Sequence, residues 1–295
     1  MGKGARSKGP RKDAKRKVRD VFVARPFEGL AAEPELIALR EFVPSATAPL
    51  TLAEGVDPEG RRITLGSVLP LAAAAMVRED DGHIFLGMQV QTRSSDVSRD
   101  LGRALRWALE ARPGQVLSVP DTTSEPREGE RLQDLLAPTA ELDVELHPDF
   151  SWWLPEGSTP TGEIAMSLER ANAAIMPTER LGPGAYWVLA GERAHLRWVW
   201  PADENRLLQA LARLSAAGEL TLGEETRYAG SFRAHGLLVP VWDLDAEAHA
   251  REWAEPAKHL GARLEEALSS LDDRPLDAAE RRARDGLIGR QLTLR

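Results

Sequence analysis

The chain has 295 residues, of which 42% are hydrophobic, and its formal charge at pH 7 is −8. It contains no cysteine, which excludes disulfide bonds, thiol catalysis and zinc bound by thiolates, and which fits a reducing, cytoplasmic setting. No run of about 18 apolar residues occurs, so we expect no membrane span. The length is sufficient for two domains of ordinary size.

The first twenty residues differ in charge from the rest of the chain. Residues 1–19 hold nine Lys or Arg and one acid, a net charge of +8, whereas residues 20–295 carry −16. This segment has almost no apolar side chain to bury, so we predict a disordered basic tail over residues 1–20. The candidate polyanion-binding residues are Lys8, Arg11, Lys12, Lys15, Arg16, Lys17 and Arg19.

Two interpretations of the tail remain open. A block of basic residues gains affinity for RNA, the ribosome or another polyanion by releasing counterions from phosphates. The alternative is a solubilising segment that lies back on the acidic body of the protein.

Residues 21–119 are predicted to form an N-terminal module of helices and strands. Leu101, Leu105 and Leu109 recur at helical spacing before Pro113, which is typical of an amphipathic helix that ends at a proline. In chain order we expect a helix within 33–44, strands flanking a turn at 54–60, a hairpin around 79–82, a helix within 94–112 and a strand at 115–119.

A polar, proline-rich segment over residues 120–138 is predicted to be a linker, with a short helix at Leu132, Leu135 and Leu136. A C-terminal module follows over 139–246, and further helices over 247–295. Within the second module we expect a helix at 161–175, a hairpin at 185–200, a helix at 202–218, a strand at 219–222 and an extended region at 226–244.

The strands are joined mostly by short turns, which favours antiparallel sheets and an α+β fold class: two similar modules with helices packed on one face of each sheet, plus C-terminal helices. Both modules share the order hairpin, helix, glycine, strand. A shift of 104 residues places Gly218 on Gly114 and Trp187 on His83. Internal duplication is one explanation; the other is that hairpin-plus-helix units are common without repetition.

The chain carries no recognisable catalytic motif. It has no P-loop, no dinucleotide-binding glycine motif, no nucleophile elbow and no zinc-protease helix, and its six histidines have no metal-ligand spacing. We therefore expect no metal and no cofactor, and assign no catalytic residue.

One pattern does suggest a ligand site. His195 and Arg197, and likewise Arg233 and His235, stand two residues apart in predicted strands, so each pair shares a face. If the two strands are neighbours, the four side chains form a surface suited to a phosphate or a carboxylate. The alternative is an ordinary exposed sheet face with polar residues that prevent aggregation.

Several long strings resemble an uncharacterised actinobacterial family of unknown function, among them "ITLGSVLPLAAAAMVR", "SLERANAAIMPTERL" and "FRAHGLLVPVWDL". The resemblance covers residues 23 to about 244. Members are often labelled as related to the preprotein translocase SecA, because some carry a Cys-rich zinc motif like that of the SecA tail. This chain lacks that motif and has no P-loop, so the resemblance implies no motor activity and supplies no catalytic residues. It implies a soluble bacterial protein, with protein-targeting machinery as one candidate partner.

Two functions follow as hypotheses. The first is a non-catalytic binding or adaptor protein whose basic arm contacts RNA, the ribosome or another polyanion. The second is a small-ligand-binding protein or an enzyme that uses the Arg/His face. A deep pocket in which Arg197, Arg233 and both histidines converge favours the second hypothesis, and a flat face favours the first.

Overall fold

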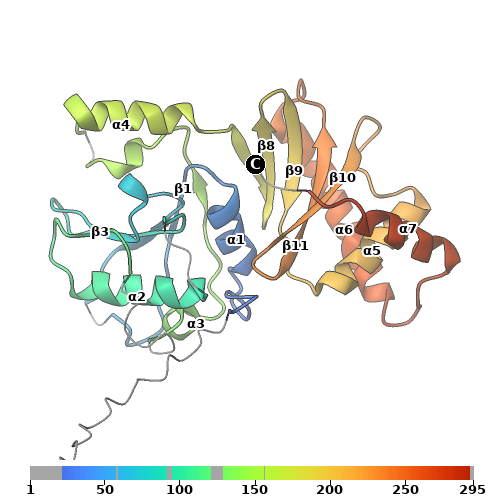
Figure 1. The fold of residues 1–295 in the computed structure, drawn as a ribbon, viewed down its shortest axis with the longest axis horizontal. Helices are drawn as coiled ribbons and strands as arrows, with labels where there is room; N and C mark the ends of the chain where they lie inside the picture. The colour runs from blue at the N-terminus through green and yellow to red at the C-terminus, as the bar shows by residue number, and fades with distance from the viewer. Residues whose placement is uncertain (1–21, 58, 92–94, 121–128, 156, 293–295) are drawn as a thin grey trace, which may run out of the picture.

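The computed structural model describes residues 22–57, 59–91, 95–120, 129–155 and 157–292. Figure 1 shows two sheets side by side, each with helices packed on it, and helix α1 (Glu33–Glu41) between them. This is the predicted α+β class with two sheet-and-helix modules and C-terminal helices. No helix in the described ranges has the length and apolar character needed to span a membrane.

The first sheet has six strands in the order β5-β3-β4-β2-β1-β6. The predicted hairpin around 79–82 is confirmed, since β3 and β4 pair antiparallel. Strands β2 and β4 pair in parallel, which differs from the expected wholly antiparallel sheet, because the chain passes through β3 before β4 returns beside β2. The elements of this module are α1, β1 (Ala46–Pro49), β2 (Ile63–Gly66), η1 (Pro70–Ala72), β3 (Ala75–Val77), β4 (Ile84–Gly87), α2 (Val97–Glu110), β5 (Val116–Leu117), α3 (Leu132–Leu135), β6 (Glu145–Leu146) and η2 (Ser151–Trp153).

Local signals explain the α2 helix. Asp96 caps its N-terminus, where the side chain accepts a hydrogen bond from the backbone N–H of Arg99. The apolar face predicted from the sequence is buried, with Leu101 and Leu105 at most 4% exposed.

The segment expected as a linker contributes to the first module. Leu132, Leu135 and Leu136 are buried in its core, and Leu132 donates its backbone N–H to the hydroxyl of Ser98. Farther along the chain, β6 pairs with β1, so the first sheet takes an edge strand from beyond residue 138. The part of the expected linker around α3 therefore belongs to the core of the first module. Residues 121–128 are not among the residues that the structure describes.

The second sheet is antiparallel throughout, in the order β10-β11-β9-β8-β7. Residues 219–222, expected as a strand, form a loop held by hydrogen bonds between Thr221 and Thr226, so the strand that follows the helix in the first module has no described counterpart here. Helix α4 (Gly162–Ala173) precedes this sheet in the chain and lies beside the first module in Figure 1. The elements of the second module are β7 (Thr178–Gly182), β8 (Ala185–Ala190), β9 (Arg193–Trp198), α5 (Glu204–Ala217), β10 (Arg227–Ala234), β11 (Leu237–Leu244), η3 (Ala250–Trp253), α6 (Ala254–Ser270) and α7 (Ala278–Ile288).

The two faces of the second sheet pack against different partners. Helices α5, α6 and α7 cover one face, where Leu196, Trp198 and Trp242 join their core. Helix α1 of the first module covers part of the other face, so that one core runs through both modules. This second face is the one that carries the site described below.

A buried carboxylate fixes α1 to the second sheet. Glu35 accepts hydrogen bonds from the Tyr186 hydroxyl, the Arg180 guanidinium and the backbone N–H of Gly184. Burial, followed by the Glu35 charge, raises the pKa of Tyr186 far above its usual range. The hydroxyl therefore stays protonated and acts as a donor across the contact between modules.

Candidate functional site

The structure separates the four Arg/His residues singled out in the sequence. His195 and Arg197 do share one face of β9, but β11 lies between β9 and β10, so the two strands are not neighbours. Arg233 packs against the start of α5, where it binds the carboxylate of Glu204. His235 lies in the turn after β10, 2.7 Å from a carboxylate oxygen of Glu41.

A β-bulge explains where Arg233 points. The register of β10 against β11 shifts between Tyr228 and Gly230, which inserts one extra residue. An insertion of one residue exchanges the faces of the side chains that follow it. Arg233 therefore lies on the helix-covered side, opposite His195 and Arg197.

His195 and Arg197 instead line a cavity of about 890 Å³, together with residues of β10 and β11, the end of α5 and the C-terminal segment. Its polar floor runs across three strands, because His195 of β9 is opposite Asp243 of β11, which is opposite Arg227 of β10. The charged and ionisable side chains of the cavity are Arg193, His195, Arg197, Arg227, Tyr228, Asp243 and Arg290. Four arginines thus face one carboxylate.

The carboxylate is already engaged. Arg227 donates from its Nε to Oδ2 of Asp243 over 2.8 Å, and Nδ1 of His195 lies 3.2 Å from Oδ1. Asp243 therefore offsets one arginine and orients one histidine, and it leaves the other arginines of the cavity without a described counter-charge.

Arg197 is the most unusual group in the cavity. Its guanidinium lies 5.7 Å from the centre of the Phe42 ring, a residue of the first module that follows α1. Burial lowers the pKa of Arg197, and no carboxylate in the described part of the chain forms an ion pair with it. A desolvated charge without a counter-charge is unfavourable, and an anion in the cavity would reduce that cost.

His195 is held in its neutral form. Burial lowers its pKa, the Asp243 carboxylate opposes this effect, and the charge of Arg197 adds to it. The sum is a pKa below the usual range, so at neutral pH the ring carries one proton.

The C-terminal segment forms one wall of the cavity. After α7 the chain returns to the second sheet (Figure 1), and the backbone of Ser231 in β10 exchanges hydrogen bonds with Arg290 and Leu292. Gly230 makes this approach possible, because a Cβ there would lie 2.5 Å from the carbonyl oxygen of Arg290. The side chains of Arg290 and Leu292 thereby reach the cavity.

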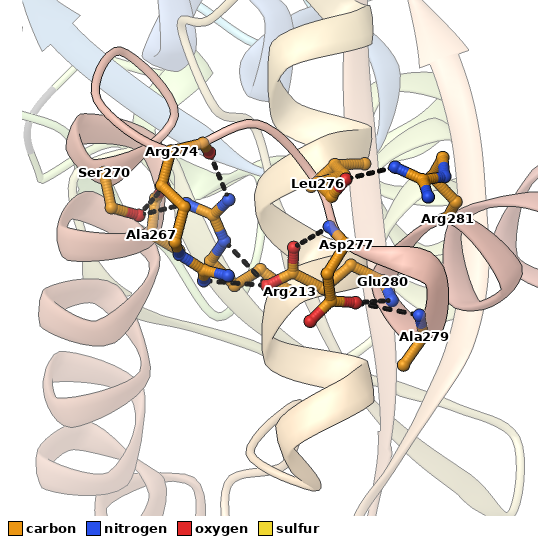
Figure 2. Close-up of polar contacts among 9 residues, drawn as sticks. All are labelled: Arg213, Ala267, Ser270, Arg274, Leu276, Asp277, Ala279, Glu280 and Arg281. Carbon is orange, nitrogen blue, oxygen red and sulfur yellow. Dashed lines mark hydrogen bonds and ion pairs between the residues drawn. The ribbon is translucent and has the colours of Figure 1, made fainter.

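A buried ion-pair cluster fixes α7, the helix that delivers this wall (Figure 2). Arg213 of α5 donates to the Glu280 carboxylate over 3.0 Å and to the carbonyl oxygen of Arg274 over 2.7 Å. Arg274 also donates to Glu280, whose second oxygen accepts the backbone N–H of Asp277 at the start of the helix. The cluster ties α5, the α6–α7 connection and α7 together.

The sequence pattern indicates some residues of this cavity but not the others. Arg193 stands two residues before His195 on the same strand face, so the alternation that identified His195 and Arg197 also signals Arg193. Arg227, Asp243 and Arg290 carry no such signal, since they join the site through strand register and through the C-terminal segment. The predicted polyanion-binding residues of the tail, from Lys8 to Arg19, lie outside the described residues.

The fold and the cavity define an α+β protein of two joined modules with a basic pocket in the second. The chain belongs to a family of unknown function, DUF5926, which matches residues 26–295. Neither the curated proteins nor the solved structures include a match to this chain.

Proposed function

We propose that this protein is a non-catalytic binding protein of the cytoplasm that takes a small phosphate- or carboxylate-bearing ligand in the cavity of its second module. The observation that carries the proposal is the half-buried guanidinium of Arg197, which faces the cavity and has no described carboxylate partner. Arginine binds oxyanions through paired N–H donors, and three further arginines line the same cavity.

The test is a calorimetric titration with inorganic phosphate and pyrophosphate at low salt. Arg197→Gln should weaken binding about 10-fold or more, because hydrogen bonds to charged groups are the strong ones. Arg233→Gln is the matched control. It removes an arginine from the opposite face of the same sheet, where Arg233 binds Glu204. We expect the control to bind as the wild type does, and equal affinity in both variants would refute the proposal.

A second candidate function rests on the charge of the N-terminal segment, +8 over residues 1–19 against −16 for the rest. We propose that this segment contacts RNA or the ribosome, with contact to protein-targeting machinery as a further version of the adaptor role. Binding to RNA should then fall steeply with salt and depend little on sequence.

The test replaces five basic residues of the segment with Gln: Arg11, Lys12, Lys15, Arg16 and Lys17. The slope of log affinity against log salt should fall by roughly 3–5 units if all five engage phosphates. Identical binding of wild type and variant, or no binding of the wild type at low salt, would leave the solubilising tail as the better interpretation.

A further inference from the structure

The polar side chains of the cavity differ in what they offer a ligand, and this difference constrains what fits there. Its four arginines can only donate. The Asp243 carboxylate accepts from Arg227 and faces Nδ1 of His195. The hydroxyls of Ser215, Thr221, Thr226 and Tyr228 can donate as well as accept. A neutral His195 differs from them, because its unprotonated ring nitrogen can only accept.

The orientation of the His195 ring determines which nitrogen accepts. A carboxylate beside one ring nitrogen fixes the proton on that nitrogen. Here Asp243 Oδ1 lies 3.2 Å from Nδ1, and Nδ1 is the enclosed nitrogen of the ring. The proton therefore stays on Nδ1, which leaves the lone pair of the ring on Nε2.

A bare anion suits the arginines but not this lone pair, because its oxygens repel an unprotonated nitrogen. A ligand that carries an anionic group and a hydroxyl can accept hydrogen bonds from the arginines and donate one to Nε2. His195 and Arg197 point the same way along β9, about 6–7 Å apart at strand spacing, which matches an anionic group a few bonds from a hydroxyl.

We propose that the ligand is an oxyanion that bears a hydroxyl group, with its charge on the arginines and its hydroxyl donating to Nε2 of His195. This inference rests on the proposed anion site and names the chemical class of its ligand. Sugar phosphates and hydroxy acids belong to that class.

The test compares glycerol 3-phosphate with n-propyl phosphate. Both are phosphate monoesters of a three-carbon chain, but only glycerol 3-phosphate carries hydroxyl groups on that chain. By calorimetry at pH 7.5 the wild type should bind glycerol 3-phosphate about fivefold more tightly, the worth of one hydrogen bond. His195→Phe should lose this preference and still bind n-propyl phosphate. His235→Phe, a histidine outside the cavity, is the matched control and should keep the preference.

A second measurement needs no variant. In ¹⁵N NMR of the wild type, Nε2 of His195 should give the signal of an unprotonated nitrogen, which shifts on addition of glycerol 3-phosphate and much less on addition of n-propyl phosphate. A proton on Nε2 in the free protein would overturn the inference.

The outcomes separate the two proposals. Equal, Arg197-dependent binding of both phosphates would overturn the hydroxyl inference and leave the anion site standing. Binding of neither phosphate would overturn both. A hydroxyl preference that survives in His195→Phe would also overturn the inference.

Discussion

Replacing Glu280 with Ala tests the role of the ion-pair cluster in Figure 2. The side chains of Arg213 and Glu280 are only 9% and 6% exposed. Burial raises the pKa of Glu280, but the Asp277 N–H and the guanidinium groups of Arg213 and Arg274 outweigh it, so its pKa lies below the usual range. The carboxylate is charged in the folded protein, and its loss leaves the Arg213 charge buried without a counter-charge.

Removing one partner of a buried pair typically costs about 3–5 kcal/mol, and we expect a loss of that size for Glu280→Ala in urea unfolding. The control is Asp272→Ala, which breaks an ion pair with Arg206 of the same helix α5. The side chains of Arg206 and Asp272 are 45% and 66% exposed, and an exposed ion pair contributes about 0–1 kcal/mol to the free energy of unfolding.

The double variant Arg213→Met with Glu280→Leu separates charge from packing. Well-packed apolar residues often replace a buried ion pair without loss, so the double variant should recover most of the stability lost in Glu280→Ala. If Glu280→Ala costs no more than Asp272→Ala, or if the double variant is the least stable of the set, the reasoning about an uncompensated charge is wrong.

Two further predictions concern the cavity wall and the first sheet. Gly230→Ala should push the C-terminal segment away from β10 and weaken phosphate binding. The control is Gly223→Ala, where the added Cβ meets open space, and this variant should bind phosphate as the wild type does. Equal titration curves for the two variants would contradict the role of the C-terminal wall. Burial, with the charges of Arg62 and Arg78, lowers the pKa of His83 to about 4. Between pH 6.5 and about 4 the imidazole of His83 takes up a proton in the unfolded chain but not in the folded protein. The neutral His83 ring therefore contributes about 3 kcal/mol to the free energy of unfolding above pH 6.5, and this contribution is lost as the pH falls toward 4. Urea unfolding at several pH values should show this loss, and His83→Gln should reduce it; an unchanged pH dependence in the variant would refute the assignment.

Elements coded by local sequence were predictable. Helix α2 has a capping aspartate, a periodic apolar face and a proline just past its end, and the β3–β4 hairpin has a turn between two apolar runs. The parallel pairing of β2 with β4 and the addition of β6 to the first sheet depend on contacts far apart in the chain. No local pattern specifies them.

The same division holds for the site. Alternation along β9 correctly placed His195 and Arg197 on one face. It could not place Arg233, because the intervening strand and the bulge in β10 are set by pairing with β11. Asp243 and Arg290 join the cavity through register and through the C-terminal segment, which single-sequence periodicity does not encode.

The most direct test of the anion site is anomalous diffraction from crystals soaked in selenate, a tetrahedral oxyanion whose position the selenium signal reveals. We expect an anomalous peak inside the cavity, within hydrogen-bond distance of the Arg197 guanidinium, and its loss in crystals of Arg197→Gln. Selenate bound at other arginines with no peak beside Arg197 would contradict it.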